Sequence, residues 1–270
     1  MKVKNLFHTA EVSKTVFDTA VDADGRIHRE ECRIVNEHMM DLYINEQLVL
    51  KLVCTPSNLT ELVVGRMISE GYIISPDEIE YIYICSSGKR ARVYLKDSEG
   101  TALKLKSAVQ EEPTCCTDNK VYLKNVNSSN AAEQILVLPK AEWKSEWIFK
   151  LANEFSSGSR IHRATQGTHS CYLSVRGEIL FACEDIGRHN ALDKAIGYAV
   201  MNGLQREICI LFTTGRVPTD MVRKVVAARI PVLVTKAVPT DAAIEMAQAY
   251  NLTLICKAWP DRYEIFNAAR

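Results

Sequence analysis

The sequence lacks both an excess of charge of either sign and any long apolar segment. Its 270 residues carry 33 lysines and arginines against 33 aspartates and glutamates, a formal net charge of zero. A balanced charge gives no electrostatic reason to expect nucleic acid or a membrane surface as a partner. No apolar run approaches the roughly 20 residues that span a bilayer, and the first residues show no signal-peptide pattern. We therefore expect a cytoplasmic protein, with no nucleic acid and no membrane among its partners.

Metal-binding spacing is absent as well. No Cys-x-x-Cys occurs in the sequence, so the usual cluster of zinc ligands is missing and we expect no metal site. The nine cysteines are an odd number, and a cytoplasmic chain of this length is not expected to form a disulfide framework. Seven of them lie in apolar, strand-like runs and are expected to be buried. They are Cys32, Cys54, Cys85, Cys171, Cys183, Cys209 and Cys256.

The adjacent pair Cys115–Cys116 lies outside any apolar run, in a polar stretch from 107 to 135 without periodicity. Such a long loop is usually functional or mobile. A thiolate that accepts sulfane sulfur must be accessible, and a loop provides access. Neighbouring cysteines do not readily form a disulfide with each other, so a single carrying thiol is favoured over a dithiol couple. An incidental exposed pair is the alternative.

Local patterns in the first half predict a small α+β module. The first 30 residues are polar and weakly patterned, which indicates an arm or an edge segment. The stretch from Asn58 to Glu61 has the capping-box pattern and opens a helix that ends near Gly71. Strands are predicted within 31–53, with a turn at Asn45–Glu46, and at 79–85, 90–96 and 102–106.

The second half alternates strands with helices. Its strands are apolar on both faces, which is typical of buried parallel strands, and the alternation predicts a sheet with helices on both faces. A helix with Trp143, Trp147 and Phe155 on one stripe comes first. After it the sequence predicts a hairpin at 170–182, helices at 190–202, 218–228 and 240–250, and strands at 207–213, 231–235 and 252–256.

Polar segments containing glycine or proline follow four of these strands. In an open α/β sheet ligands bind beyond the carboxyl ends of the strands, so these segments are expected to converge at one edge. Arginines, lysines and helix starts are natural partners of phosphates. We therefore predict a nucleotide or pyrophosphate ligand, although each segment alone is explained by a turn and a helix cap. The basic residues are Arg188, Arg216, Lys236, Lys257 and Arg262, with Thr213, Thr214 and Thr240 as donors and Trp259 for stacking.

Two roles remain open for Glu184, Asp185 and His189. They suit acid–base chemistry, but Asp185 and His189 would equally order the loop, with His189 as a donor to the ligand. His162 and His169, just before the hairpin, are further candidates for contact with an anion.

The eleven residues Glu184-Asp-Ile-Gly-Arg-His-Asn-Ala-Leu-Asp-Lys194 resemble the FdhD family of formate dehydrogenase accessory proteins. Further matches lie in family order at Val35–Asn36, Thr55–Pro56, Thr214–Arg216 and Pro239–Thr240. The resemblance implies a sulfur carrier required for formate dehydrogenase activity. A cysteine desulfurase would load a persulfide, and the sulfur would pass to the bis-molybdopterin guanine dinucleotide molybdenum cofactor before its insertion into formate dehydrogenase.

The same resemblance implies an α/β fold. A cytidine-deaminase-like domain, with a mixed or parallel sheet between helices, is expected at 136–270, and a smaller α+β module with the cysteine loop (about 107–130) at 1–135. It also suggests a homodimer. The persulfide would form on Cys115 or Cys116, although the Cys-x-x-Cys of better-known members is missing here. The expected cofactor-binding residues are Lys257, Ala258, Trp259, Pro260, Asp261, Arg262, Asp185, Gly187, Arg188, His189, Asn190, Thr214, Gly215, Arg216 and Lys236.

Sulfur transfer has two alternatives. A molybdenum-cofactor-binding chaperone without sulfur transfer would bind the cofactor but need no cysteine. A nucleobase deaminase is disfavoured because the zinc-binding cysteines are missing.

Overall fold

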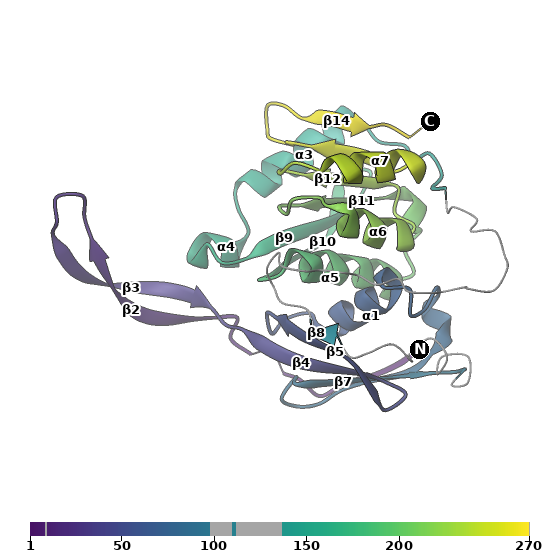
Figure 1. Ribbon diagram of the computed structural model, residues 1–270, viewed down its shortest axis with the longest axis horizontal. Helices are drawn as coiled ribbons and strands as arrows, with labels where there is room; N and C mark the ends of the chain where they lie inside the picture. The colour runs from purple at the N-terminus through teal and green to yellow at the C-terminus, as the bar shows by residue number, and fades with distance from the viewer. Residues whose placement is uncertain (9, 98–109, 112–136, 270) are drawn as a thin grey trace.

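The computed structural model describes residues 1–8, 10–97, 110–111 and 137–269 (Figure 1). These residues form two six-stranded sheets and a separate two-stranded ribbon. Cys115, Cys116, the predicted strand at 102–106 and the predicted domain boundary at 135–136 lie outside the described residues.

The first sheet is built from the N-terminal half and has the order β1–β6–β7–β4–β5–β8. The predicted turn at Asn45–Glu46 is confirmed: both residues have positive φ, 46° and 66°, as a tight hairpin turn between β4 and β5 requires. The strands are β1 (Lys2–Asn5), β4 (His38–Ile44), β5 (Gln47–Cys54), β6 (Ile79–Ile84), β7 (Arg90–Leu95) and β8 (Gln110–Glu111), with a short 3₁₀ helix η1 (Pro76–Glu78) before β6.

Helix α1 (Leu59–Ser69) covers this sheet, and all but one of its residues are buried. The helix ends as predicted, with Gly71 in the left-handed region at φ 72°. The predicted capping box is wrong. Asn58 itself has φ 51°, and its side chain makes no capping hydrogen bond, so the start of α1 is stabilised by packing instead.

The second sheet has the order β10–β9–β11–β12–β13–β14. Helix α3 covers one face, where Ile148 and Leu151 pack on Phe212, and α5, α6 and α7 cover the other (Figure 1). The bounds are α3 (Ser145–Ser156), α4 (Arg160–Thr165), β9 (His169–Val175), β10 (Glu178–Asp185), α5 (Arg188–Met201), η2 (Arg206–Ile208), β11 (Cys209–Thr213), α6 (Thr219–Ala227), β12 (Val232–Thr235), α7 (Asp241–Ala249), β13 (Thr253–Cys256) and β14 (Glu264–Asn267).

One continuous apolar core joins the two sheets, because α1 packs directly on α5. The predicted α/β class, a mixed sheet between helices with a smaller α+β part, is confirmed. Strand β14 and helix α4 were not predicted. Among the described residues, no helix is both long and apolar enough to cross a membrane.

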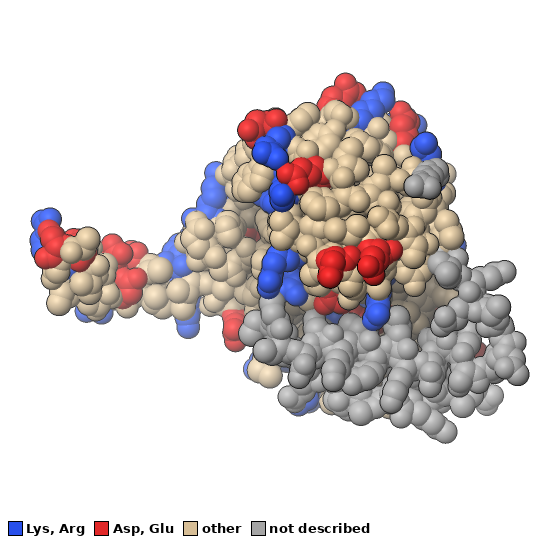
Figure 2. Space-filling view, turned by 45° about the horizontal axis from the view of Figure 1, so that its top comes forward, with Lys and Arg blue, Asp and Glu red and all other residues tan. Residues whose placement is uncertain are grey.

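The ribbon of β2 (Ser13–Val21) and β3 (Ile27–Val35) projects away from the sheets as an arm (Figure 1). The predicted arm is therefore present, although it extends beyond residue 30 and is preceded by β1. Charged side chains of both signs are mixed along it (Figure 2). Phe17, Val21 and Ile27 are 60%, 65% and 71% exposed, which is high for large apolar side chains.

Candidate functional site

The strands of the second sheet bring the predicted segments to one edge. Strand β11 is parallel to β12, and β12 is parallel to β13. Strand β9 is antiparallel to both β10 and β11, so β10 runs in the same direction as β11. The carboxyl ends of β10, β11, β12 and β13 therefore share an edge with the first residue of β9, His169.

A pocket of about 620 Å³ opens at this edge, a volume within the range of small-molecule sites. Its walls come from the end of α3, one face of α4, the start of β9 and the segments after β10, β11 and β12. None of the described residues that line it is acidic. The polar lining residues that carry the argument are His162, Arg163, His169, Thr214 and Lys236.

The two histidines are held by hydrogen bonds on their Nδ1 atoms. His162 Nδ1 lies 2.7 Å from the carbonyl oxygen of Thr168, so it carries the hydrogen and donates. His169 Nδ1 lies 3.2 Å from Thr214 Oγ1, and this oxygen accepts from the Ser170 N–H at 3.1 Å. The hydroxyl hydrogen of Thr214 can then point at His169 Nδ1, which favours the tautomer with a hydrogen on Nε2.

The pKa of His169 is lowered from its ordinary value. Burial is the largest cause, followed by the positive charges of Arg188, His162 and His189, while Asp185 opposes the shift. His169 is therefore neutral at pH 7 and offers a neutral N–H to a ligand.

Lys236 links the pocket to the predicted 257–262 segment. Its Nζ donates to the carbonyl oxygen of Phe155 at 3.2 Å and lies 5.3 Å from the centre of the Trp259 ring. Burial lowers the pKa of Lys236. A half-buried ammonium beside an aromatic ring is suited to a ligand that carries both a phosphate and a base.

The 257–262 segment lies at the surface beside the pocket. Trp259 is 46% exposed, and its N–H donates to the carbonyl oxygen of Arg262 at 2.7 Å. Lys257 and Arg262 both pair with the carboxylate of Glu264, at 2.8 Å and 2.6 Å. Ala258 is fully buried, whereas Pro260 and Asp261 are exposed. The two cations therefore already share one carboxylate.

Arg188 packs on Gly215 at the same edge. A Cβ atom at position 215 would lie 2.9 Å from the Cβ of Arg188, so only glycine permits this contact. Arg216 is exposed. His189 Nε2 lies 2.7 Å from Asp220 Oδ2, so the loop-ordering role of His189 has a direct structural basis.

Asp185 lies inside the protein and away from the pocket. It is fully buried and pairs with Lys194 Nζ at 2.7 Å. It also accepts from the backbone N–H of Thr55 and of Gly187, at 3.0 Å and 2.9 Å. Both carboxylate oxygens of Asp185 therefore have partners inside the protein. This network argues against the predicted contact between Asp185 and a cofactor.

Asn190 belongs to the same buried network. Its Nδ2 donates to Asp185 and to the carbonyl oxygen of Val53, and its Oδ1 accepts from Arg66 at 3.1 Å. Arg66 in turn pairs with Asp193 at 2.8 Å. These contacts connect α1 and α5 and join the two sheets.

The contacts of Glu184 favour a structural role over acid–base chemistry. It accepts hydrogen bonds from the backbone N–H groups of Ile161 and His162 and from the hydroxyls of Ser159 and Thr168. It thus anchors the start of α4. This contact could not be predicted from the sequence, because the donors lie 16 to 25 residues away in the chain.

The described cysteines differ from the prediction in two cases. Five are buried as expected, and burial raises their pKa, to about 12 for Cys54, Cys183 and Cys256 and about 11 for Cys209. Cys32 and Cys85 are only half-buried, so their predicted burial is wrong. Burial raises the pKa of the Cys85 thiol, but hydrogen bonds from Ser87 and from backbone groups of the turn outweigh burial and lower it.

Among the residues that the structure describes, no group of three or more His, Cys, Asp or Glu side chains is placed to hold a metal ion.

The fold and the basic pocket together define an α/β protein suited to binding an anion at the carboxyl edge of its second sheet. The model of the FdhD/NarQ family matches residues 35–270. The chain therefore belongs to the FdhD/NarQ family, as its sequence motifs predicted.

Similar proteins cover nearly the whole chain. The sulfur carrier protein FdhD of Listeria monocytogenes serotype 4b is 27% identical over 246 residues, 90% of this chain and 92% of that one. The sulfur carrier protein FdhD of Bacillus subtilis is 30% identical over 235 residues, 86% and 87% of the two chains. The crystal structure of a candidate formate dehydrogenase accessory protein from Desulfotalea psychrophila matches with a TM-score of 0.74 at 22% identity, covering 96% and 98%. This last likeness shows the fold.

Proposed function

We propose that the chain is a sulfur carrier required for formate dehydrogenase activity. A cysteine desulfurase transfers a sulfur atom to the thiolate of Cys115 or Cys116, which then carries it as a persulfide. The persulfide passes the sulfur to the bis-molybdopterin guanine dinucleotide molybdenum cofactor, and the cofactor is then inserted into formate dehydrogenase. The working form is a homodimer.

The observation that carries this proposal is family membership over residues 35–270, together with relatives named as sulfur carriers. The chemistry of the described cysteines supports it. A carrier needs an accessible thiolate, and burial keeps five of the seven described thiols protonated at neutral pH. Cys115 and Cys116, which lie outside the described residues, are the candidates that the sequence favours.

The basic pocket supports the cofactor-binding part of the proposal. Its cations, Arg163 and Lys236, and the Nε2–H donor of His169 suit the pyrophosphate of a guanine dinucleotide, and Trp259 offers a ring for stacking. Lys236 contacts that ring, so the pocket and the 257–262 segment can hold one ligand together. The cofactor is cargo in this scheme.

Intact mass spectrometry after incubation with a cysteine desulfurase and cysteine tests the proposal. Wild type should gain mass corresponding to one or more sulfur atoms, and a reductant should remove it. The gain should disappear in the Cys115→Ala/Cys116→Ala variant, and the single variants should identify the carrier. Cys85→Ala is the matched control, because Cys85 is half-buried and has a lowered thiol pKa.

A gain that is lost only in Cys85→Ala would overturn the assignment to Cys115 or Cys116. No gain in any form, with binding of guanosine diphosphate intact, would favour the cofactor-binding chaperone, since the basic pocket would serve that role equally well.

A further inference from the structure

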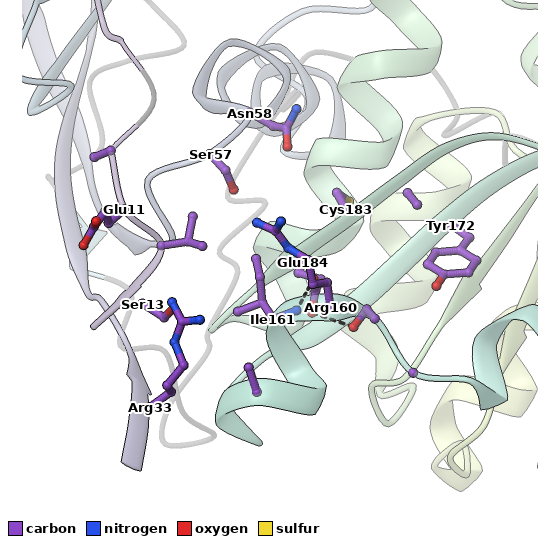
Figure 3. A pocket seen from close by; sticks show the side chains of 16 residues that line it. Glu11, Ser13, Arg33, Ser57, Asn58, Arg160, Ile161, Tyr172, Cys183 and Glu184 are labelled. Atoms are coloured by element: carbon purple, nitrogen blue, oxygen red, sulfur yellow. Dashed lines mark hydrogen bonds between the residues drawn. The ribbon is translucent and has the colours of Figure 1, made fainter. Parts of the chain in front are cut away.

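A second cavity, of about 820 Å³, lies against the opposite face of α4 (Figure 3). Arg160, Ile161 and Ala164 line it, whereas His162 and Arg163 face the pocket described above. Its other walls are the base of the arm at 10–13, the turn before α1 and the end of β10. The cavity therefore lies where the arm meets the two-sheet body.

Two guanidinium groups reach this cavity from different elements. Arg33 comes from β3 of the arm, and its Nη2 donates to Ser13 Oγ at 3.0 Å. Arg160 comes from the first position of α4, and its side chain points into the cavity (Figure 3). Among the residues that the structure describes, the Arg160 side chain has no hydrogen-bond or ion-pair partner. Guanidinium groups are the preferred donors to phosphate and carboxylate oxygens.

Two acidic side chains also line the cavity, but neither forms an ion pair with Arg33 or Arg160. Glu184 lines the cavity, but its two oxygens accept four hydrogen bonds from the 159–168 segment, which leaves it committed to holding α4. The other carboxylate, Glu11, is exposed. The guanidinium group of Arg160 therefore remains available to an anion.

Neutral donors complete the lining. Ser57 and Asn58 line the cavity immediately before α1, and the side chain of Asn58 is not used to cap that helix. Tyr172 and Ile161 add apolar surface. This mixture of a few cations, several neutral polar groups and apolar walls is typical of a small-molecule site.

We propose that this cavity binds a small anionic molecule through its phosphate or carboxylate group, with Arg33 and Arg160 as the charged contacts. Bound there, the ligand bridges the arm and α4, so its presence fixes the arm relative to the body. The site lies on the other side of α4 from the pocket at the carboxyl edge, with which it shares only Gly158 and Ser159 of its lining, and it does not depend on sulfur transfer.

Protection of individual arginines from phenylglyoxal, mapped by peptide mass spectrometry on the full chain, tests the proposal. Pyrophosphate and citrate serve as the phosphate and carboxylate probes, and whichever protects identifies the chemical group. Modification of Arg33 and Arg160 should slow by at least about threefold, since a bound anion covers both guanidinium groups. Arg229, exposed and outside both pockets, is the control and should keep its rate.

Two variants separate this cavity from the other pocket. Protection of Arg33 should be lost in Arg160→Gln and should persist in Lys236→Gln. Because the side chain of Arg160 is exposed, its substitution should not disturb folding. Equal modification rates of Arg33 and Arg160 with and without both probes would overturn the proposal. Protection that disappears in Lys236→Gln would assign the binding to the carboxyl-edge pocket instead.

Discussion

Gly65 of α1 and Gly197 of α5 face each other where the two helices cross, and neither position has room for a side chain. A Cβ on Gly65 would lie 1.7 Å from the carbonyl oxygen of Asp193, and one on Gly197 would lie 1.8 Å from that of Glu61. This close approach brings the helix on the first sheet against the helix on the second. The shared core and the buried network around Asp185 both depend on it.

Gly197→Ala should therefore destabilise the protein strongly. The methyl group would overlap backbone, which cannot move aside cheaply, so we expect a loss of about 3 kcal/mol or more in the free energy of unfolding, measured in urea. Gly203→Ala is the control, because an added Cβ there meets no atom within 4 Å and only the φ of 62° is strained. That strain costs about 1–2 kcal/mol. Equal losses in the two variants would contradict the close crossing.

The buried pair of Lys194 and Asp185 gives a second prediction. Lys194→Met removes the ammonium and leaves a fully buried carboxylate without its cation, which should cost about 3–5 kcal/mol of unfolding free energy. Adding Asp185→Asn removes the unpaired charge, so the double variant should be more stable than the sum of the single losses predicts. Urea unfolding of all four proteins measures this coupling. Strictly additive losses would mean that the two side chains do not act as a pair.

The sequence predicted the edge of the second sheet well, because its strands are apolar and each is followed by a polar segment. It could not predict which side chains of those segments face the pocket. Asp185 and Arg188 are three residues apart, yet Asp185 is buried against Thr55 and Arg188 lies at the sheet edge beside Gly215. The partner that decides this, Thr55, lies 130 residues away in the chain.

Cys85 shows a similar limit. It ends an apolar run, Ile79–Ile84, and periodicity therefore predicted burial. The strand stops one residue earlier, and Cys85 occupies the turn before β7, where Ser87 Oγ lies 3.3 Å from its sulfur. A local sequence pattern does not show at which residue a strand leaves the core, so the exposure of Cys85 could not be predicted.

Acid should destabilise the protein through Glu70. Burial raises the pKa of Glu70, but the charges of Lys224 and Arg66 outweigh burial and lower it from its ordinary value of 4.5 to about 2. A depressed pKa in the folded state contributes stability that is present above the unfolded value and is lost as pH falls toward the folded value. Unfolding free energy should therefore fall between about pH 4.5 and about pH 2.

Urea unfolding at a series of pH values, in wild type and Glu70→Gln, measures this contribution. The variant should be less stable at pH 6 but should lose less stability on acidification across that range. A variant with the same pH dependence as wild type would show that other carboxylates, such as Asp220, dominate acid unfolding.

Lys236→Gln should weaken binding of guanosine diphosphate by about tenfold, because one charged contact to a phosphate is lost in a half-buried setting. Titration calorimetry at low salt gives the affinity. Lys150→Gln, which removes an exposed lysine of α3 outside the pocket, is the matched control and should bind as wild type does. Unchanged affinity in Lys236→Gln would place the nucleotide away from the carboxyl-edge pocket.

Glu264 should compete with the nucleotide for Lys257 and Arg262. The hydrogen bond from Lys257 lowers the pKa of Glu264. Desolvation opposes this shift, but the charges of Lys257 and Arg262 add to it, so Glu264 is ionised at neutral pH. Glu264→Gln should then raise the affinity for guanosine diphosphate by about threefold at low salt, and high salt should abolish the difference because the groups are exposed. Glu245→Gln, on the exposed surface of α7, is the control. Weaker binding in Glu264→Gln would instead mean that the carboxylate holds the two cations in the positions in which they meet the phosphates.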